Sequence, residues 1–429
     1  MAPMAVAPPA TAVASRALRA ELPDFVGARV EGFHRRLALG WGGRHILRGR
    51  RPGDGDLLMQ SNDYLSIADH AEIIGAQRSS LGTSGLGMMM SAQFLQDEDE
   101  PLRRLEALLA DAVGFEAGIL TQSGFAANVG LLQAIAGPGV PVYIDLLAHA
   151  SLREGGRSAG APAISVLHNN LSHLERQLAQ NGPGVIVVDA IYSTDGSVSP
   201  LRETADLARR HGCVLVVDES HSLGVHGDHG EGLVAALGLT DSVHFLTASL
   251  AKAYCARAGF IACTARFREY FGMEALPAIF SSALLPHDLA GIGAAHGVVR
   301  DESWRRARLR GTTRRVRSGL RRLGYPINDD DEPIVALEVG TEADTIVVRD
   351  VLEANGIFGS VFCAPATATN RALIRLTLNA AMGDDDVDRF LTTLERVRPD
   401  LGVDSWSASR RAPRPPTGLT VTVGAGVPI

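Results

Sequence analysis

Lys252 lies in the segment T-A-S-L-A-K, directly after an apolar run at residues 243–247. A lysine held near a buried site can lose its proton readily enough to form an imine with an aldehyde cofactor. A lysine at the end of a strand is more often a solvated surface charge. This segment by itself therefore leaves both interpretations open.

Asp218 and His221 supply two further groups suited to such a cofactor. Asp218 ends the apolar run V-L-V-V-D, and a carboxylate at the mouth of a sheet can pair with a protonated pyridine nitrogen and keep the ring an electron sink. His221 could donate a hydrogen bond to the phenolic oxygen of the cofactor. The alternative is a helix-capping aspartate with a polar neighbour. The D-E-S-H spacing, with Lys252 further along, favours the functional interpretation.

Three other segments could complete a phosphate and ring site. Ser123, Gly124 and Phe125 come between a predicted strand and a predicted helix, where backbone amides and the helix N-terminus form a phosphate cradle. Ser249 could add a hydroxyl to the same phosphate. His149, in L-A-H-A-S-L, could lie flat on a pyridine ring, or it could be a satisfied core histidine.

Arg375 is flanked by Ile374 and Leu376 in a predicted strand of a second, smaller unit. A guanidinium in that place could grip a substrate carboxylate in a two-pronged pairing. The alternative is an edge-strand arginine that faces water.

The elements that must position these groups form an α/β pattern. Residues 185–189, 214–218 and 243–247 are short, apolar and rich in β-branched residues, and helical patterns such as 201–211 separate them. Apolar strands that alternate with helices predict a mostly parallel sheet covered on both faces. Ligands bind beyond the carboxyl ends of such strands, so the polar clusters after the three strands should converge.

The pattern changes after residue 300. A long helical segment is followed by predicted strands at 334–339 and 373–378, which indicates a smaller α+β domain. Both ends of the chain have little periodic apolar content and are predicted to be flexible. The expected division is an N-terminal arm at 1–60, a large cofactor-binding domain at 61–300, a small C-terminal domain at 301–400 and a disordered tail at 401–429.

Composition narrows the class of protein. The chain has 429 residues, 46% hydrophobic and 21% charged, which excludes a disordered or fibrous protein. The net charge is -7, and the one Arg-rich stretch, at 304–322, has a period that suits the solvated face of a helix. Nucleic acid is therefore not an expected partner.

The four cysteines are far apart and show no C-x-x-C pair and no histidine at metal-ligand spacing, so neither a disulfide framework nor a metal site is expected. The N-terminus lacks the basic region of a signal peptide, and no apolar stretch is long enough to cross a bilayer. A reducing cytoplasm, with no membrane partner, is the expected location.

Seven segments in order resemble the α-oxoamine synthases, pyridoxal-phosphate (PLP) enzymes that condense an amino acid with an acyl-CoA and usually decarboxylate the product. The resemblance covers residues 62–388 and implies the fold-type I PLP-dependent transferase fold. It is carried by S-N-D-Y-L (61–65), S-G-F-A-A-N (123–128), A-H-A-S-L (148–152), Y-S-T-D-G (192–196), V-D-E-S-H-S-L-G (217–224), T-A-S-L-A-K and I-R-L-T-L-N (374–379).

The resemblance implies a role for each matching residue. His149 would stack on the ring, Asp218 would pair with its nitrogen, and Lys252 would form the Schiff base. The catalytic set is therefore Lys252, His149, Asp218 and His221. The remaining contacts would come from Ser193 and His221 to the phenolic oxygen; Gly124, Phe125 and Ser249 to the phosphate, with Ser282 from a second subunit; and Asn62 and Arg375 to the substrate carboxylate. Ser123 and Thr247 complete the expected cofactor-binding set. The resemblance also implies a homodimer with its site at the interface.

Within the family, longer segments such as P-A-I-F-S-S-A-L-L-P and G-I-F-G-S-V-F-C-A-P-A-T resemble autoinducer synthases that make long-chain α-aminoketones for quorum sensing. Where other relatives carry a Gly-rich segment with an arginine, this chain reads G-L-G-M-M-M-S-A-Q-F. Three consecutive methionines offer flexible apolar volume, which would suit a fatty acyl chain. Ordinary core packing is an equal alternative.

The resemblance implies a decarboxylating condensation of an α-amino acid, or S-adenosylmethionine, with a medium- or long-chain acyl-CoA. One alternative is the acyl donor of an 8-amino-7-oxononanoate synthase or a glycine C-acetyltransferase. Another is a non-catalytic PLP-binding regulator or partner subunit, which would be expected to lack the lysine or to carry a DNA-binding domain. The amino acid is open, with 2-aminobutyrate, glycine, alanine and serine also possible, and the product could be a signal or an intermediate.

Overall fold

The apolar runs between residues 117 and 263 form one seven-stranded sheet in the computed structural model, which describes residues 22–88, 90–94 and 100–410. The strand order is β2-β8-β7-β6-β5-β3-β4, and β8 runs antiparallel to both neighbours while the other pairs are parallel. The strands are β2 (Ala117–Thr121), β3 (Val142–Asp145), β4 (Ala163–Val166), β5 (Val185–Asp189), β6 (Val214–Asp218), β7 (Phe245–Ser249) and β8 (Gly259–Cys263).

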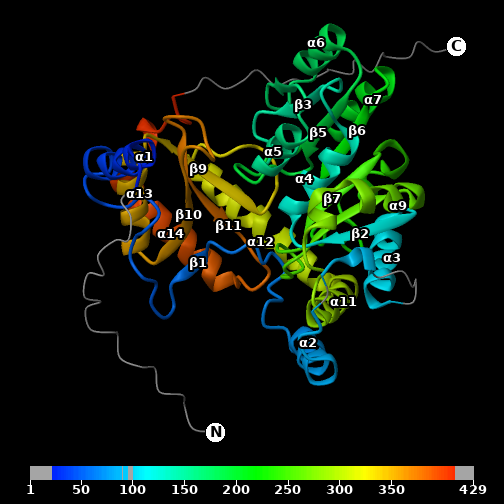
Figure 1. Cartoon of the computed structure of the whole chain (residues 1–429). Coiled ribbons are helices and arrows are strands. Elements are labelled where there is room, and N and C mark those ends of the chain that lie inside the picture. The colour runs from blue at the N-terminus through cyan, green and yellow to red at the C-terminus, as the bar shows by residue number, and fades with distance from the viewer. Residues whose placement is uncertain (1–21, 89, 95–99, 411–429) are drawn as a thin grey trace, which may run out of the picture.

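Alternation along the strands explains why this sheet is covered on both sides. In β5, Val185 and Val187 pack with α4, α5 and α9, whereas Ile186 and Val188 pack in the other core with α3, α6 and α7. Successive side chains point to opposite faces, so a strand that is buried throughout requires helices on both. The expected α/β fold is confirmed (Figure 1).

A second sheet of four strands lies beside the first (Figure 1). Its order is β1-β10-β11-β9, in which β1 is parallel to β10 and the other two pairs are antiparallel. The strands are β1 (Leu57–Met59), β9 (Ile334–Gly340), β10 (Ile357–Phe362) and β11 (Ala372–Thr377). The predicted smaller α+β unit is thus present, built from segments at both ends of the chain.

Each sheet and the α-helices packed around it form one lobe of the molecule (Figure 1). The helices are α1 (Asp24–Arg35), α2 (Ala71–Ser84), α3 (Pro101–Val113), α4 (Gly124–Ile135), α5 (Ala150–Ser158), α6 (Leu171–Asn181), α7 (Leu201–Arg210), α8 (Leu233–Ala236), α9 (Ala265–Glu274), α10 (Leu276–Ile279), α11 (Pro286–Asp301), α12 (Ser303–Arg322), α13 (Glu342–Ala354) and α14 (Asp384–Leu401). Among the described residues, no helix has both the length and the apolar character needed to cross a bilayer.

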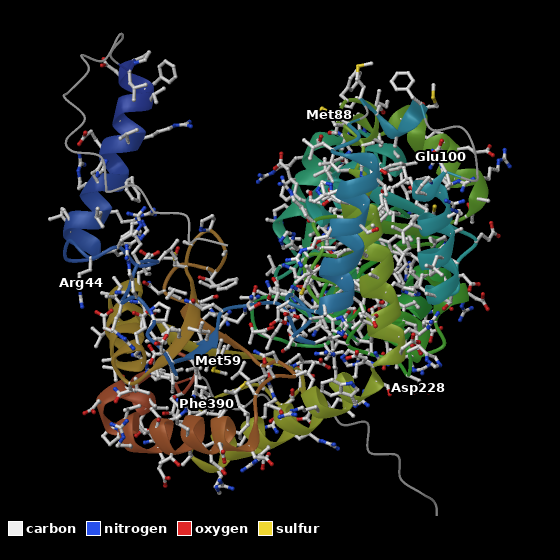
Figure 2. The ribbon with its side chains drawn as sticks, turned by 90° about the horizontal axis from the view of Figure 1, so that it is seen from below. Arg44, Met59, Met88, Glu100, Asp228 and Phe390 are labelled. Carbon is white, nitrogen blue, oxygen red and sulfur yellow. The ribbon has the colours of Figure 1, made fainter. Side chains whose placement is uncertain are left out.

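The structure differs from the expected N-terminal arm and tail. β1 pairs with β10, so residues 57–59 form part of the smaller sheet, while α1 stands away from it (Figure 2). Trp406 is buried and Ser407 donates its backbone N–H to Val339 O, so the chain is packed to at least this point. The buried Trp406 side chain packs this segment against the protein, although the sequence of the segment shows no apolar periodicity. Residues 1–21 and 411–429 lie outside the described part.

The Arg-rich helix also differs from its prediction. Two of its arginines, Arg306 and Arg317, are almost fully buried. Arg317 donates to the carbonyl oxygens of Glu332 and Ile334, and Arg306 donates to that of Val299. These guanidinium groups pair their buried N–H donors with backbone carbonyls of α11, β9 and the segment before β9. The solvated face is therefore only part of α12.

Candidate active site

Eleven of the predicted site residues line one cavity of about 2120 Å³, a volume that includes space open to solvent. The cavity opens where β5, β6 and β7 end, and the smaller lobe closes its other side. The eleven are Asn62, Ser123, Gly124, Phe125, His149, Ser193, Asp218, His221, Ser249, Lys252 and Arg375.

Lys252 lies in the turn that follows β7 and is the only lysine in the chain. Its pKa is lowered by burial and by the charge of Arg375, against an opposing effect of Asp218. A lower pKa increases the fraction of neutral amine, which is the form that attacks an aldehyde. Counting lysines would have singled out this residue, because every other Lys or Arg position is an arginine.

Asp218 is held as an acceptor by two donors. Its Oδ2 accepts from Asn128 Nδ2 at 2.7 Å, and its Oδ1 accepts from the backbone N–H of Ser220 at 2.9 Å. The side chain is almost fully buried but still borders the cavity. Both carboxylate oxygens thus have a fixed donor, and the group is suited to face a cation.

Asn128, on α4, was not predicted as a site residue, and it explains the position of Thr247. Thr247 Oγ1 donates to Asn128 Oδ1 at 2.7 Å, and Asn128 Nδ2 also contacts Ser151 Oγ at 2.8 Å. Thr247 is completely buried and does not line the cavity. In this position it orients Asn128, which in turn holds Asp218, while its cofactor contact stays a prediction.

His221 is buried against Tyr64, whose hydroxyl lies 2.6 Å from His221 Nδ1. Burial and the nearby charge of Lys252 hold the pKa of His221 well below its ordinary value, and burial raises the pKa of Tyr64. Tyr64 therefore keeps its proton and donates to Nδ1. The hydrogen of the neutral ring is then on Nε2, where it can be donated to a ligand.

His149 forms the N-cap of α5 and borders the cavity. Its backbone N–H donates to the Asp189 carboxylate at 3.2 Å, and its Nδ1 lies 2.7 Å from Ser151 Oγ. Burial and the charge of Asp218 raise the pKa of Asp189 well above its usual range. Asp189 thus fixes the backbone at His149, a role that the sequence analysis did not assign.

The start of α4 provides a close-fitting turn. Ser123 caps the helix, with its hydroxyl accepting from Ala126 N at 3.1 Å. A Cβ on Gly124 would lie 2.6 Å from the Cβ of Ser249, so only glycine allows this approach of the two segments. Free backbone N–H groups of the first turn and the Ser249 hydroxyl border the same cavity, which suits an anion.

Arg375 reaches from β11 toward the larger lobe. It donates to Asn62 Oδ1 and to the carbonyl oxygen of Ser193, each at 2.8 Å, and its guanidinium lies 4.8 Å from the centroid of Phe362. The side chain is almost fully buried, so the alternative of a solvated edge-strand arginine is wrong. The arrangement leaves a fixed cation beside an amide, as a carboxylate would require.

A single subunit does not bring Ser282 or the methionine segment to the cavity. Ser282 does not line the cavity, and its carbonyl oxygen accepts from Gln122 Nε2 at 2.6 Å. Met88 and Met90 are largely exposed (Met88 is labelled in Figure 2), so they neither pack in the core nor border this cavity. Met89, between them, lies outside the described residues.

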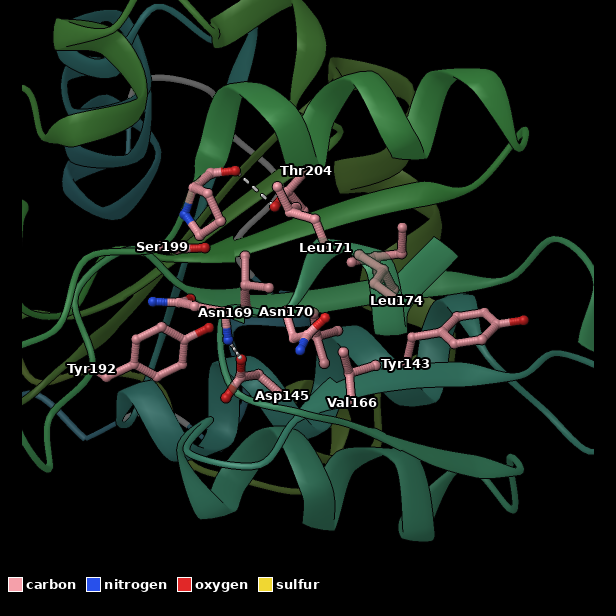
Figure 3. A pocket seen from close by; sticks show the side chains of 14 residues that line it. Tyr143, Asp145, Val166, Asn169, Asn170, Leu171, Leu174, Tyr192, Ser199 and Thr204 are labelled. Atoms are coloured by element: carbon pink, nitrogen blue, oxygen red, sulfur yellow. Dashed lines mark hydrogen bonds between the residues drawn. The ribbon is translucent and has the colours of Figure 1, made fainter. Parts of the chain in front are cut away.

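A second cavity, of about 310 Å³, lies under α6 and α7 (Figure 3) and is bordered by Asp145 and Tyr192. Beside it Asp145 Oδ1 lies 2.9 Å from His168 Nδ1, and His168 Nε2 lies 2.9 Å from Ser197 Oγ. The order resembles a hydrolytic triad. However, Ser197 is buried and its hydroxyl donates to Asp195, so it is a support for the turn after β5 and not a nucleophile.

The chain matches the family model for aminotransferase class I and II over residues 64–394. It is 45% identical over 377 residues to the CAI-1 autoinducer synthase of Vibrio campbellii, covering 88% of this chain and 95% of that protein. It is 34% identical over 389 residues to the 8-amino-7-oxononanoate synthase of Anaeromyxobacter dehalogenans, covering 88% and 96%. The chain belongs to the α-oxoamine synthase family.

Solved structures agree on the fold of this α-oxoamine synthase. A serine palmitoyltransferase from Sphingomonas wittichii superposes with a TM-score of 0.80 at 24% identity, covering 90% of this chain and 100% of that one. An 8-amino-7-oxononanoate synthase from Francisella tularensis gives 0.72 at 22% identity, covering 81% and 99%. The expected fold-type I architecture and a PLP-dependent acyltransferase are confirmed.

The residues of this α-oxoamine synthase fit PLP. The Gly124 turn can receive a phosphate, Asp218 offers a buried carboxylate to a ring nitrogen, and Lys252 offers the amine for the aldehyde. His149 borders the same cavity. Each requirement of the cofactor thus meets a group of matching chemistry.

Glu219, the residue after Asp218, gives the synthase a pH-dependent stability. It is fully buried, its Oε1 accepts from Val234 N at 2.6 Å, and burial raises its pKa from 4.5 to about 7. The folded chain therefore keeps a proton that the unfolded chain has released between these values. This contribution to stability is complete below pH 4.5 and is lost as the pH rises through about 7.

We expect Glu219→Gln to remove this dependence. Its urea midpoint should fall less between about pH 5 and about pH 8 than that of the parent protein, because the amide does not titrate. Glu203→Gln, at an exposed position of α7, is the matched control and should behave as the parent does. Parallel pH profiles for parent and Glu219→Gln would contradict the assignment.

Proposed function

We propose that this enzyme condenses an α-amino acid, or S-adenosylmethionine, with a medium- or long-chain acyl-CoA and releases CoA and CO2. The Cα–H bond of the substrate breaks, a carbon–carbon bond forms between Cα and the acyl carbonyl carbon as the thioester C–S bond breaks, and CoA leaves as the protonated thiol. Loss of the carboxylate as CO2 and protonation at Cα then give an α-aminoketone. The observation that carries the proposal is the 45% identity to the CAI-1 autoinducer synthase, together with a single lysine in the cavity.

The proposed residue roles follow the contacts in the cavity. Bound PLP supplies an electron sink for negative charge at the substrate Cα. Arg375 and Asn62 grip the substrate carboxylate, Asp218 holds a proton at the pyridine nitrogen, and Lys252 moves the proton at Cα. His149 covers one face of the ring and excludes water from it.

The other residues of the cavity contact the phosphate and the phenolic oxygen of the cofactor. Ser123, Gly124, Phe125 and Ser249 hold the phosphate. The Nε2–H of His221 and the hydroxyl of Ser193 donate to the phenolic oxygen. The position of His221 Nδ1 against Tyr64 supports this tautomer.

We also propose a homodimer located in the cytoplasm. Exposed apolar side chains at Met88, Met90, Phe94 and Phe280 support a subunit contact, because isolated subunits rarely expose such groups together. Ser282, close to Phe280 in the chain, would then contribute to the partner's cavity. Four unpaired cysteines support a reducing compartment.

A panel of acyl-CoA chain lengths against several amino acids tests the acyl donor. We expect the highest kcat/KM with medium- or long-chain donors, and a product whose mass equals that of the aminoketone. Mass spectrometry of the product from mixed substrates identifies both partners at once. A clear preference for pimeloyl-type donors would instead favour an 8-amino-7-oxononanoate synthase. The relative of that name is 34% identical to this chain.

A further inference from the structure

Helix α5 carries two arginines along the wall of the active-site cavity. It begins directly after His149, and Arg153, Glu154 and Arg157 border the same cavity as Lys252. Residues four apart share one face of a helix, and Arg157 is about 6 Å further along the axis than Arg153. The two guanidinium groups therefore form a short basic track that leads outward from the reacting centre.

Neither guanidinium is held by a strong ion pair within the described residues. Arg153 donates to Ser165 Oγ and to the carbonyl oxygen of Asp145, each at 3.5 Å, the outer limit for a hydrogen bond. Arg157 lies 3.6 Å from Glu154, and both side chains are more than half exposed. Such a surface pair is weak, so a stronger anion can displace it.

The other cations that border the cavity have tasks of their own. Arg375 is already paired with Asn62 and Ser193, and Lys252 lies at the strand ends. Of the cavity-lining cations in the described part of the chain, Arg153 and Arg157 thus remain for a second anionic group. Glu154 also borders the cavity between them, and one carboxylate against two guanidinium groups leaves the track net positive.

We propose that Arg153 and Arg157 bind the phosphate groups of the CoA portion of the acyl donor. This inference rests on the proposed function, in which an acyl thioester reaches the substrate Cα. The thioester carbon must approach Lys252, so the phosphorylated nucleotide must trail outward through the open side of the cavity. Guanidinium groups match phosphate oxygens in number and geometry, and the spacing along α5 offers two successive contacts.

The test compares two acyl donors with the holoenzyme. Decanoyl-CoA carries the phosphates, and decanoyl-pantetheine has the same reacting end without them. In Arg153→Ala plus Arg157→Ala, the ratio of kcat/KM for decanoyl-CoA to that for decanoyl-pantetheine should fall at least about tenfold, chiefly through KM. In each single variant this ratio should lie between those of the parent and the double variant. Arg153→Lys should keep part of the preference for decanoyl-CoA because it keeps the positive charge.

Arg209→Ala is the matched control. Arg209 is an exposed arginine paired with Asp206 on α7, and it does not border the cavity, so its ratio should equal that of the parent. The parent KM for decanoyl-CoA should also rise with salt more steeply than that of the double variant. Equal ratios in the double variant and the parent would overturn the inference.

A binding measurement separates this inference from the proposed function. If the parent turns over no acyl thioester, the proposed function fails, but calorimetric titration of free CoA into the holoenzyme still decides the role of the arginines. Binding that is about tenfold weaker in the double variant supports it. No binding of CoA by the parent, or equal binding by both proteins, overturns it.

Discussion

Lys252→Ala should lose the long-wavelength absorbance of the cofactor bound as a Schiff base and lower kcat on the order of 10⁴-fold. The physical reason is that the chain then has no side-chain amine at all, because Lys252 is its only lysine. Borohydride reduction of the PLP-loaded parent should therefore label one internal peptide. Mass spectrometry of digests, with steady-state rates, measures both effects.

Lys252→Arg is the matched control for charge. A guanidinium keeps the positive charge beside Asp218 but does not form the imine, so this variant should bind PLP better than Lys252→Ala and remain as inactive. Thermal unfolding of the three proteins checks that folding is retained. Absorbance and turnover that survive in Lys252→Ala would disprove the assignment of the lysine.

Asp218→Asn should lower kcat on the order of 10³-fold, the scale seen when a fixed electrostatic contact to developing charge is removed. The substitution keeps the size of the side chain but removes the negative charge from the ring nitrogen. It can also turn an amide N–H toward Asn128 Nδ2, which now donates to the carboxylate. PLP affinity and kcat, measured separately, distinguish weak binding from slow chemistry.

Asp189→Asn provides the comparison, because Asp189 pairs in register with Asp218 at the end of the neighbouring strand. Its pKa is raised well above the usual range by burial and by Asp218, so an amide resembles its protonated form. An asparagine oxygen can still accept from the His149 N–H. We expect a much smaller loss of kcat than in Asp218→Asn, and equal losses would contradict different roles for the two carboxylates.

Local sequence patterns were sufficient to predict the central strands of the larger sheet. The strands at 185–189 and 214–218 were predicted with the bounds observed, because continuous β-branched runs between helices have few other structures available. The strand predicted at 243–247 is observed at Phe245–Ser249, since a 3-10 turn at Thr240–Ser242 delays its start. The meeting of the polar strand ends followed from the parallel sheet alone.

Contacts between distant segments were beyond local patterns. Asn128 and Tyr64 lie in two of the segments that carry the family resemblance, yet those segments do not tell that one holds Asp218 and the other fixes the His221 tautomer. The buried contact of Thr247 was equally beyond local patterns. Its side chain points behind the cavity to Asn128, and only the packing of α4 on β7 decides that.

The sequence by itself determined the chemical class of this protein: a unique lysine, an aspartate and histidine at matching strand ends, and the α/β pattern that brings them together. The tertiary structure alone decided which atoms meet. Arg375 is turned to Asn62 and Ser193 across the two lobes, and Arg153 and Arg157 face the same cavity as Lys252. These outcomes depend on strand register and helix packing, which join residues far apart in the chain and therefore leave no short-range pattern.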